Sequence, residues 1–178
     1  MQRREVVRFL GAALALPFLP RSAEAAIALG EQVHLRLIGE EVPFRTLNAA
    51  QQRLVTEIAE MIIPETDTPG ATAVKVPQFI DLILTEWASD DERAGFLAGL
   101  AEIEGKGFTS GSRADKTDLL TTLDSARDAK TGAVLAFNRI KALTVYGYFT
   151  SKPVQQNILK TQMFFDGYHG NVPFTPAT

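Results

Sequence analysis

The segment from about Ala133 to Thr150 constrains the fold more than any other stretch, because it is apolar on nearly every side of a helical wheel. Its large apolar side chains are Val134, Leu135, Phe137, Ile140, Leu143, Val145, Tyr146, Tyr148 and Phe149. Such a helix has to be surrounded by other elements that remove those side chains from water. The segment therefore predicts the central rod of a bundle.

Shorter segments supply the helices that can surround it. A helix from Asn48 to about residue 62 begins with a capping box formed by Asn48 and Gln51 and has one buried face. Pro77 opens a second helix, residues 90–92 open a third with three acidic side chains, and a fourth follows from about 114 to 126. A short helix is expected after Pro153. We predict an all-α fold, a compact bundle of five to six helices around the central one, within residues 46–178.

Residues 26–45 show a different pattern. Val33, Leu35 and Leu37 alternate with polar residues, and Pro43 closes the segment. The chain has no second convincing strand to pair with this one, so we predict an extended arm that lies over the helices.

The first 25 residues have the order of an export signal. The pair Arg3-Arg4 precedes an apolar run from Phe9 to Leu19, and the small-residue pattern Ala23-Glu24-Ala25 follows. The run is too short for an ordinary membrane span, and the arginine pair is typical of twin-arginine signals, which direct the export of folded proteins. Glu5-Val6-Val7 departs from the usual continuation of such signals, and an ordinary secretory signal is the alternative. We predict a twin-arginine-type signal peptide at residues 1–25 and a periplasmic location.

The composition excludes several kinds of site. The 178 residues include no cysteine, which rules out disulfides, cysteine-ligated iron–sulfur clusters and a cysteine nucleophile. The net charge is −3 before the arginine-rich start is removed, so no basic surface for nucleic acid is expected. His34 and His169 lack helix-spaced ligand partners for zinc, and no GxGxxG motif follows a strand. We predict no catalytic residue, no metal site and no cofactor site in this chain.

The loop from Ile62 to Ala71 has a distinctive composition, with two prolines, a glycine, two acids and two threonines. Pro64 stops the preceding helix and favours an extended Ile63, and Pro69-Gly70 favours a turn in which the glycine is free to take a positive φ. Rigid loops on helical scaffolds are often recognition surfaces, although a plain helix connection is the alternative. The candidate partner-binding residues here are Ile63, Pro64, Asp67, Pro69 and Gly70.

Two further candidates lie in the aromatic tail. Phe165 and Tyr168 follow the last expected helix and could insert into a partner, because aromatic residues are enriched in interfaces. A hydrolase that uses Glu65 and Asp67 as a carboxylate pair is the least favoured alternative.

Several motifs occur in one order along the chain: Leu47 to Gln52, Met61 to Pro64, Asp67 to Ala71, Val76-Pro77 with Phe79-Ile80-Asp81, and Gly147 to Ser151. With this combination the chain resembles the gluconate 2-dehydrogenase subunit 3 family, the small or gamma subunits of bacterial periplasmic flavin-dependent sugar and polyol dehydrogenases. The likeness covers roughly residues 46–153. Its specific part is Ile-Ile-Pro together with Thr-Pro-Gly-Ala.

The resemblance implies a non-catalytic partner of an enzyme. In such complexes a large subunit of the glucose-methanol-choline oxidoreductase type carries FAD and the substrate pocket, and a cytochrome c subunit often takes the electrons. The small subunit carries the export signal, here Arg3 and Arg4, for a large subunit that lacks one, and it supports that subunit's maturation. The twin-arginine translocase would then be a further partner. A stand-alone periplasmic helical protein that binds a small molecule is the alternative.

Overall fold

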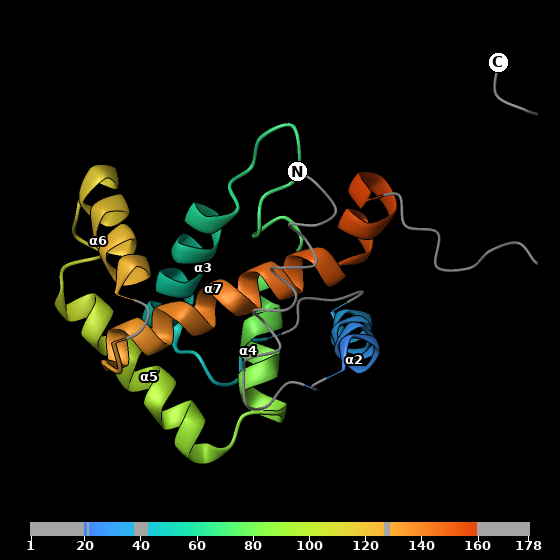
Figure 1. The fold of residues 1–178 in the computed structure, drawn as a ribbon, viewed down its shortest axis with the longest axis horizontal. Helices are drawn as coiled ribbons and strands as arrows, with labels where there is room; N and C mark the ends of the chain where they lie inside the picture. The colour runs from blue at the N-terminus through green and yellow to red at the C-terminus, as the bar shows by residue number, and fades with distance from the viewer. Residues whose placement is uncertain (1–19, 21, 38–42, 127–128, 160–178) are drawn as a thin grey trace, which may run out of the picture.

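The computed structural model describes residue 20 and residues 22–37, 43–126 and 129–159. These residues form helices and loops without a strand (Figure 1), so the predicted all-α class is confirmed. The elements are α2 (Ala23–Arg36), α3 (Ala49–Ile62), α4 (Val76–Glu86), α5 (Asp90–Gly105), α6 (Arg113–Ser125), α7 (Gly132–Thr150) and the π-helical η1 (Val154–Leu159). None of these described helices combines the length and the apolar composition that crossing a membrane requires.

Helix α7 is the central rod that the sequence predicts. It crosses the middle of the molecule, and α2, α3, α4, α5, α6 and η1 all pack against it (Figure 1). Ile140 and Leu143 are completely buried, whereas Leu135, near the start of the helix, keeps 53% of its surface exposed. Burial on nearly all sides explains why the segment has almost no polar face.

The first turn of α7 depends on α5. Thr131, its N-cap residue, makes no side-chain cap, and instead the carboxylate of Glu102 accepts a hydrogen bond of 2.8 Å from the backbone N–H of Ala133. This bond satisfies one of the free donors at the helix start. The two helices approach closely because α5 has a glycine at the contact, and a Cβ on Gly99 would lie 2.6 Å from that of Ala136.

The prediction of an extended arm at residues 26–45 is wrong for residues 26–36, because they belong to α2, whereas the described residues 43–45 are not helical. The alternation of Val33, Leu35 and Leu37 suggested a strand, but the buried apolar residues recur with helical spacing. They are Ala26, Leu29, Val33 and Leu37. Helix α2 also includes the last three residues of the predicted signal peptide, whose residues 1–19 lie outside the described part of the chain.

Asp81 on α4 fixes the chain that leads into α3. Its buried carboxylate accepts hydrogen bonds from the backbone N–H groups of Arg45 (2.8 Å), Thr46 (3.1 Å) and Leu47 (2.8 Å). Three donors on one buried carboxylate satisfy its oxygens without a cation. The predicted capping box of Asn48 and Gln51 then starts α3 immediately afterwards, and it is confirmed.

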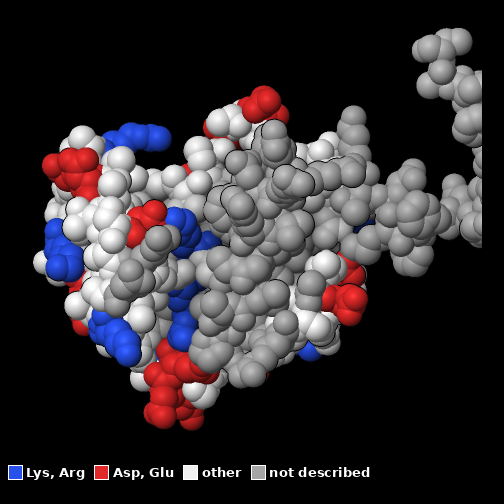
Figure 2. Space-filling model, in the orientation of Figure 1, with Lys and Arg blue, Asp and Glu red and all other residues white. Residues whose placement is uncertain are grey.

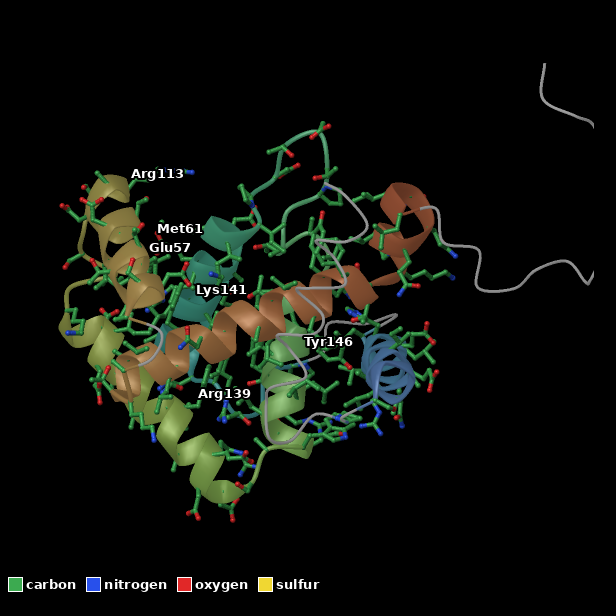
Figure 3. The ribbon with its side chains drawn as sticks, viewed as in Figure 1. Glu57, Met61, Arg113, Arg139, Lys141 and Tyr146 are labelled. Atoms are coloured by element: carbon green, nitrogen blue, oxygen red, sulfur yellow. The ribbon has the colours of Figure 1, made fainter. Side chains whose placement is uncertain are left out.

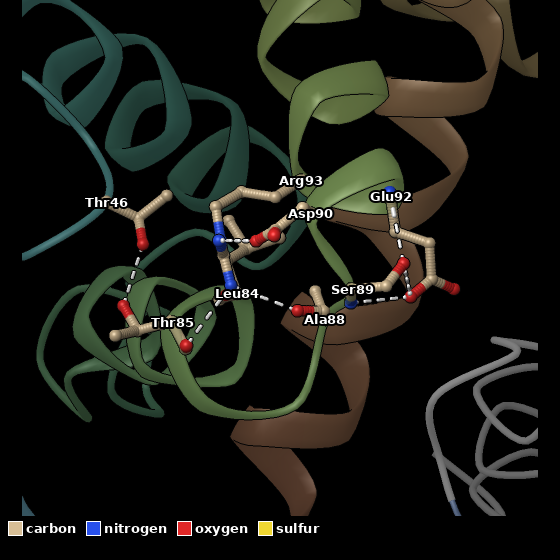
Figure 4. Close-up of polar contacts among 8 residues, drawn as sticks. All are labelled: Thr46, Leu84, Thr85, Ala88, Ser89, Asp90, Glu92 and Arg93. Atoms are coloured by element: carbon tan, nitrogen blue, oxygen red, sulfur yellow. Dashed lines mark hydrogen bonds and ion pairs between the residues drawn. The ribbon is translucent and has the colours of Figure 1, made fainter.

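The turn between α4 and α5 is held by one arginine (Figure 4). The guanidinium of Arg93 donates to the backbone carbonyls of Leu84 (2.9 Å) and Ala88 (3.0 Å) at the end of α4, and it pairs with Asp90 at 2.8 Å. Carbonyls at a helix end have no partner within the helix, so a cation there satisfies them and interacts favourably with the helix dipole.

We predict that Ile140→Ala lowers the free energy of unfolding by about 2–5 kcal/mol, because it leaves a cavity where every neighbour is already packed. Leu135→Ala on the same helix is the matched control, and it should cost less than about 1 kcal/mol because Leu135 is exposed. Chemical denaturation of the two variants measures the difference. Equal losses would show that α7 is not the centre of the core.

Candidate functional site

The chain between α3 and α4 forms a loop that projects from the body of the molecule (Figure 1). Pro64, Glu65, Thr66 and Asp67 are exposed at its tip, and Figure 2 shows acidic side chains there. We call residues 63–72 the proline loop. An exposed loop normally loses conformational entropy when it binds, so its rigidity decides how useful it is for recognition.

One glutamate from α3 holds the two ends of the proline loop together. The carboxylate of Glu60 accepts a hydrogen bond from the backbone N–H of Glu65 through Oε1 and another from that of Thr72 through Oε2, each at 3.0 Å. The two donors lie seven residues apart in sequence, so a single side chain closes the loop.

Gly70 is needed for a reason that differs from the sequence expectation. Among the described residues the only glycine with a positive φ is Gly107, so the expectation of a positive φ at Gly70 is wrong. Gly70 is buried, and a Cβ there would overlap the Glu60 carboxylate and lie 2.8 Å from the backbone nitrogen of Glu65. The missing side chain makes room for the Glu60 bridge.

The loop is also tied to the central helix. The buried Tyr148 of α7 donates its hydroxyl hydrogen to the carbonyl oxygen of Pro69 at 2.8 Å. Within the loop, the N–H of Ala71 donates to the carbonyl of Ile63 at 2.9 Å. With Glu60 these bonds satisfy backbone groups along the loop, which is therefore ordered before any partner arrives.

The hydrogen bonds to Glu60 favour its charged form. Partial burial raises the pKa of this carboxyl group, but the bonds from Thr72 and Glu65 lower it by more, so the pKa lies below its usual value of 4.5. The ionised carboxylate can accept both bonds, whereas the protonated group loses acceptor capacity.

A cleft of about 380 Å³ opens beside the loop, between the end of α3 and the start of α6. Figure 3 shows Glu57 and Met61 on the side of α3 that faces α6, and Arg113 at the outer end of α6. Lys116 is 2.5 Å from Glu57, and its ammonium lies 5.5 Å from the ring centre of Phe108. The cleft thus has acidic groups from α3 on one wall and basic groups from α6 on the other.

A second hollow of about 530 Å³ lies on another side of α3. Its lining includes the apolar Phe44 and Pro77 and shares Glu57 and Glu60 with the first cleft. Both are surface hollows next to the loop, so the exposed side of α3 and the proline loop form one uneven surface with room for side chains of another molecule.

Within the described residues, neither His34 nor the acid pair forms a recognisable reaction centre, and His169 lies outside them. His34 is buried, and its Nε2 lies 2.7 Å from the carbonyl oxygen of Gly147. Burial lowers the pKa of His34 more than this hydrogen bond raises it, which favours a neutral ring within the core. Glu65 lines the first cleft, whereas Asp67 lies at the exposed tip and accepts a hydrogen bond from Thr66. Across the described ranges, no three His, Cys, Asp or Glu side chains gather as a metal site would need.

The structure brings five of the sequence candidates together in the proline loop. Pro64 and Asp67 are exposed, Ile63 and Pro69 are half-buried, and Gly70 is buried, so Gly70 shapes the loop from within. Phe165 and Tyr168 lie outside the described residues, as does most of the predicted signal.

Sequence reasoning missed the two residues that fix the loop, Glu60 and Tyr148. A signal for Glu60 was present, because an acidic residue in the last turn of a helix opposes the helix dipole and needs a compensating contact. Tyr148 carried no such signal, since a tyrosine among apolar residues also fits a plain core position.

A family model described as gluconate 2-dehydrogenase subunit 3 matches residues 49–167. The match includes α3, the proline loop and α7, and it begins after α2. No curated protein and no solved structure matches the chain.

We predict that Glu60→Gln destabilises the protein by about 1–2 kcal/mol, because the amide has one acceptor oxygen for two backbone donors. Faster hydrogen exchange at the amides of Glu65 and Thr72 would locate the effect in the loop. Glu65→Gln, an exposed carboxylate in the same loop, is the control and should change neither quantity.

The same bridge predicts a pH dependence. Since the pKa of Glu60 is lowered in the folded state, its contribution to stability is present above the usual pKa of 4.5 and is lost as the pH falls through the lowered value. Thermal melts of the parent and of Glu60→Gln between pH 7 and pH 3 should therefore converge at the acid end. A constant difference across that range would contradict this role of the carboxylate.

Proposed function

Because this chain belongs to the gluconate 2-dehydrogenase subunit 3 family, we propose that it is the non-catalytic small subunit of a periplasmic FAD-dependent sugar or polyol dehydrogenase. Its partner is a large subunit of the glucose-methanol-choline oxidoreductase type, which carries FAD and the substrate pocket. The small chain supplies a binding surface and an export signal, and the chemistry takes place in the partner.

The observation that carries this proposal is the proline loop, which is exposed at its tip and fixed from beneath. Glu60 bridges its ends, and Tyr148 ties it to α7. A loop that is ordered in advance loses little entropy on binding, so its exposed residues can contribute fully to affinity. The lining of the neighbouring clefts offers both charges and apolar surface to a protein partner.

The export step joins this surface to the N-terminal sequence. Twin-arginine export moves folded proteins, so a flavoprotein that takes up FAD in the cytoplasm can cross the membrane while it is bound to a companion that carries Arg3 and Arg4. The bundle suits export in the folded state because its helices pack around α7 into one core. The chain has to be folded before its loop surface can bind a partner.

Two-electron oxidation of a sugar or polyol leaves the partner's flavin reduced, and those electrons need an acceptor. A cytochrome c subunit is the acceptor that we propose for the complex. The electrons need not pass through the small chain, which has no cysteine to ligate an iron–sulfur cluster.

We predict that Asp67→Arg weakens binding of the flavoprotein partner at least about tenfold, because it reverses a charge at the exposed tip without removing a support of the loop. Asp118→Arg, an exposed aspartate in the middle of α6, is the matched control. Co-purification from cells that express both chains, followed by titration of the separated subunits, measures the affinity. If the two variants bind alike and as tightly as the parent, the loop tip is not in the interface. A chain that purifies alone as a monomer and binds a sugar would favour the small-molecule alternative.

We predict that replacing Arg3-Arg4 with a lysine pair leaves the flavoprotein partner in the cytoplasm, because receptor-read signals depend on the arginine pair itself. Dehydrogenase activity and FAD content in periplasmic and cytoplasmic fractions measure the outcome. We call the export of the bound partner by this chain the escort role. Full activity of the partner in the periplasm of cells with this variant would overturn it.

A further inference from the structure

The Ala23-Glu24-Ala25 pattern, which marks the end of the predicted signal, lies inside a helix. These residues form the first turn of α2, and the hydroxyl oxygen of Ser22 caps this turn by accepting a hydrogen bond of 3.2 Å from the N–H of Ala25. The N–H of Ala26 donates to the carbonyl of Ser22 at 3.0 Å. The bond that a signal peptidase would cut, between Ala25 and Ala26, is therefore part of a hydrogen-bonded helical turn.

The residue after that bond is held against the core. Ala26 is only 6% exposed, and its carbonyl oxygen accepts a hydrogen bond from the hydroxyl of Tyr146 on α7. Figure 3 shows Tyr146 between α7 and α2. Burial raises the pKa of the Tyr146 phenol, which keeps it protonated as a donor. If the turn unwound, this buried hydroxyl would lose the acceptor of its hydrogen bond, which is costly.

The rest of α2 is docked along its length. Gly30 lies so close to α7 that a Cβ there would be 2.7 Å from the side chain of Thr150, and Val33 is completely buried. His34 stacks on Phe79 with 4.9 Å between ring centres and contacts the carbonyl of Gly147.

The end of α2 is held as well. Lys75 donates from Nζ to the carbonyl of Leu37 at 2.9 Å. The backbone of Lys75 has a φ of 60°, in the left-handed region that residues other than glycine seldom adopt. Both ends of the helix are therefore anchored, and the first turn cannot loosen independently of a docked neighbour.

Peptidases act on extended and exposed backbone, which is why cleavage concentrates at loop tips and at free chain ends. We propose that docked α2 protects the Ala25–Ala26 bond, so that the folded chain keeps residues 1–25 until α2 leaves the bundle. The inference rests on the proposed export signal for the identity of the bond, and it adds that folding and removal of that signal exclude one another.

This exclusion has a consequence for a chain that crosses the membrane folded. The signal peptidase encounters the chain only after α2 has docked. The rate of signal cleavage then indicates whether α2 is docked. A partner that binds the α2 side of the bundle would slow cleavage further, whereas one that pulls α2 away would permit it.

The test uses the purified full-length chain, a bacterial signal peptidase in detergent micelles and intact-mass spectrometry. A synthetic peptide of residues 1–32 provides the same bond without a bundle on which to dock. We expect the folded chain to be cleaved at least about tenfold more slowly than the peptide, because cleavage has to wait for local opening. Tyr146→Phe and Gly30→Ala should raise the rate, since the first removes the bond to Ala26 and the second forces α2 away from Thr150. Tyr148→Phe is the matched control, because its hydroxyl contacts Pro69 instead, and it should behave as the parent does.

Cleavage of the parent at the rate of the peptide would overturn the proposal, and so would a peptide that is not cut between Ala25 and Ala26. Equal rates for Tyr146→Phe, Gly30→Ala and Tyr148→Phe would overturn the assigned role of docking. The assay contains neither the flavoprotein partner nor the translocase. Its failure is therefore distinct from failure of the escort role, which depends on where the partner accumulates.

Discussion

The burial of α7 on nearly all sides is the constraint on which the rest of this structure depends. A helix without a polar face has to be enclosed, and each surrounding helix in the described part of the chain is placed by its contact with it. The close approaches occur where the side chain is absent, at Gly99 toward Ala136 and at Gly147 toward the ring of Phe79. Such close packing allows few other arrangements of the helices, so the exposed helix surfaces have fixed positions relative to one another.

The proline loop has a fixed position because it is bonded to two of these packed helices, α7 and α3. Tyr148 belongs to the buried helix α7. Its hydrogen bond to the carbonyl of Pro69 therefore fixes the position of the loop relative to the core. Glu60 closes the loop from the neighbouring α3, which packs on the same helix. Two motifs that are far apart in the sequence, the Thr-Pro-Gly-Ala turn and the Gly-Tyr-Phe stretch, therefore act as one structural unit. Family membership makes this chain a subunit of a dehydrogenase complex, and the shape of this unit supports our proposal that the proline loop binds the partner.

Periodicity and capping predicted most of the fold. The apolar stripe and capping box of α3, Pro77 at the start of α4 and the acidic start of α5 all depend on neighbours within one or two turns, so the sequence displays them directly. The error at residues 26–45 has the opposite cause. In α2, Gly30 packs against the side chain of Thr150, and His34 contacts the carbonyl of Gly147. Each of these contacts joins residues more than one hundred positions apart, so the sequence nearby does not display them. Tyr148 was missed for the same reason, since its role exists only when the loop and α7 are assembled. Glu60 gave a local signal as an acid in the last turn of α3, but the two loop amides that it binds are identified only by the assembled loop.

The most direct test of the account places a photo-crosslinking amino acid at position 65, at the tip of the proline loop, and at position 118 on α6, in cells that also produce the proposed flavoprotein partner. The account predicts that irradiation joins the chain to the large subunit from position 65 and gives little product from position 118. Efficient crosslinking from position 118 with none from position 65 would contradict it.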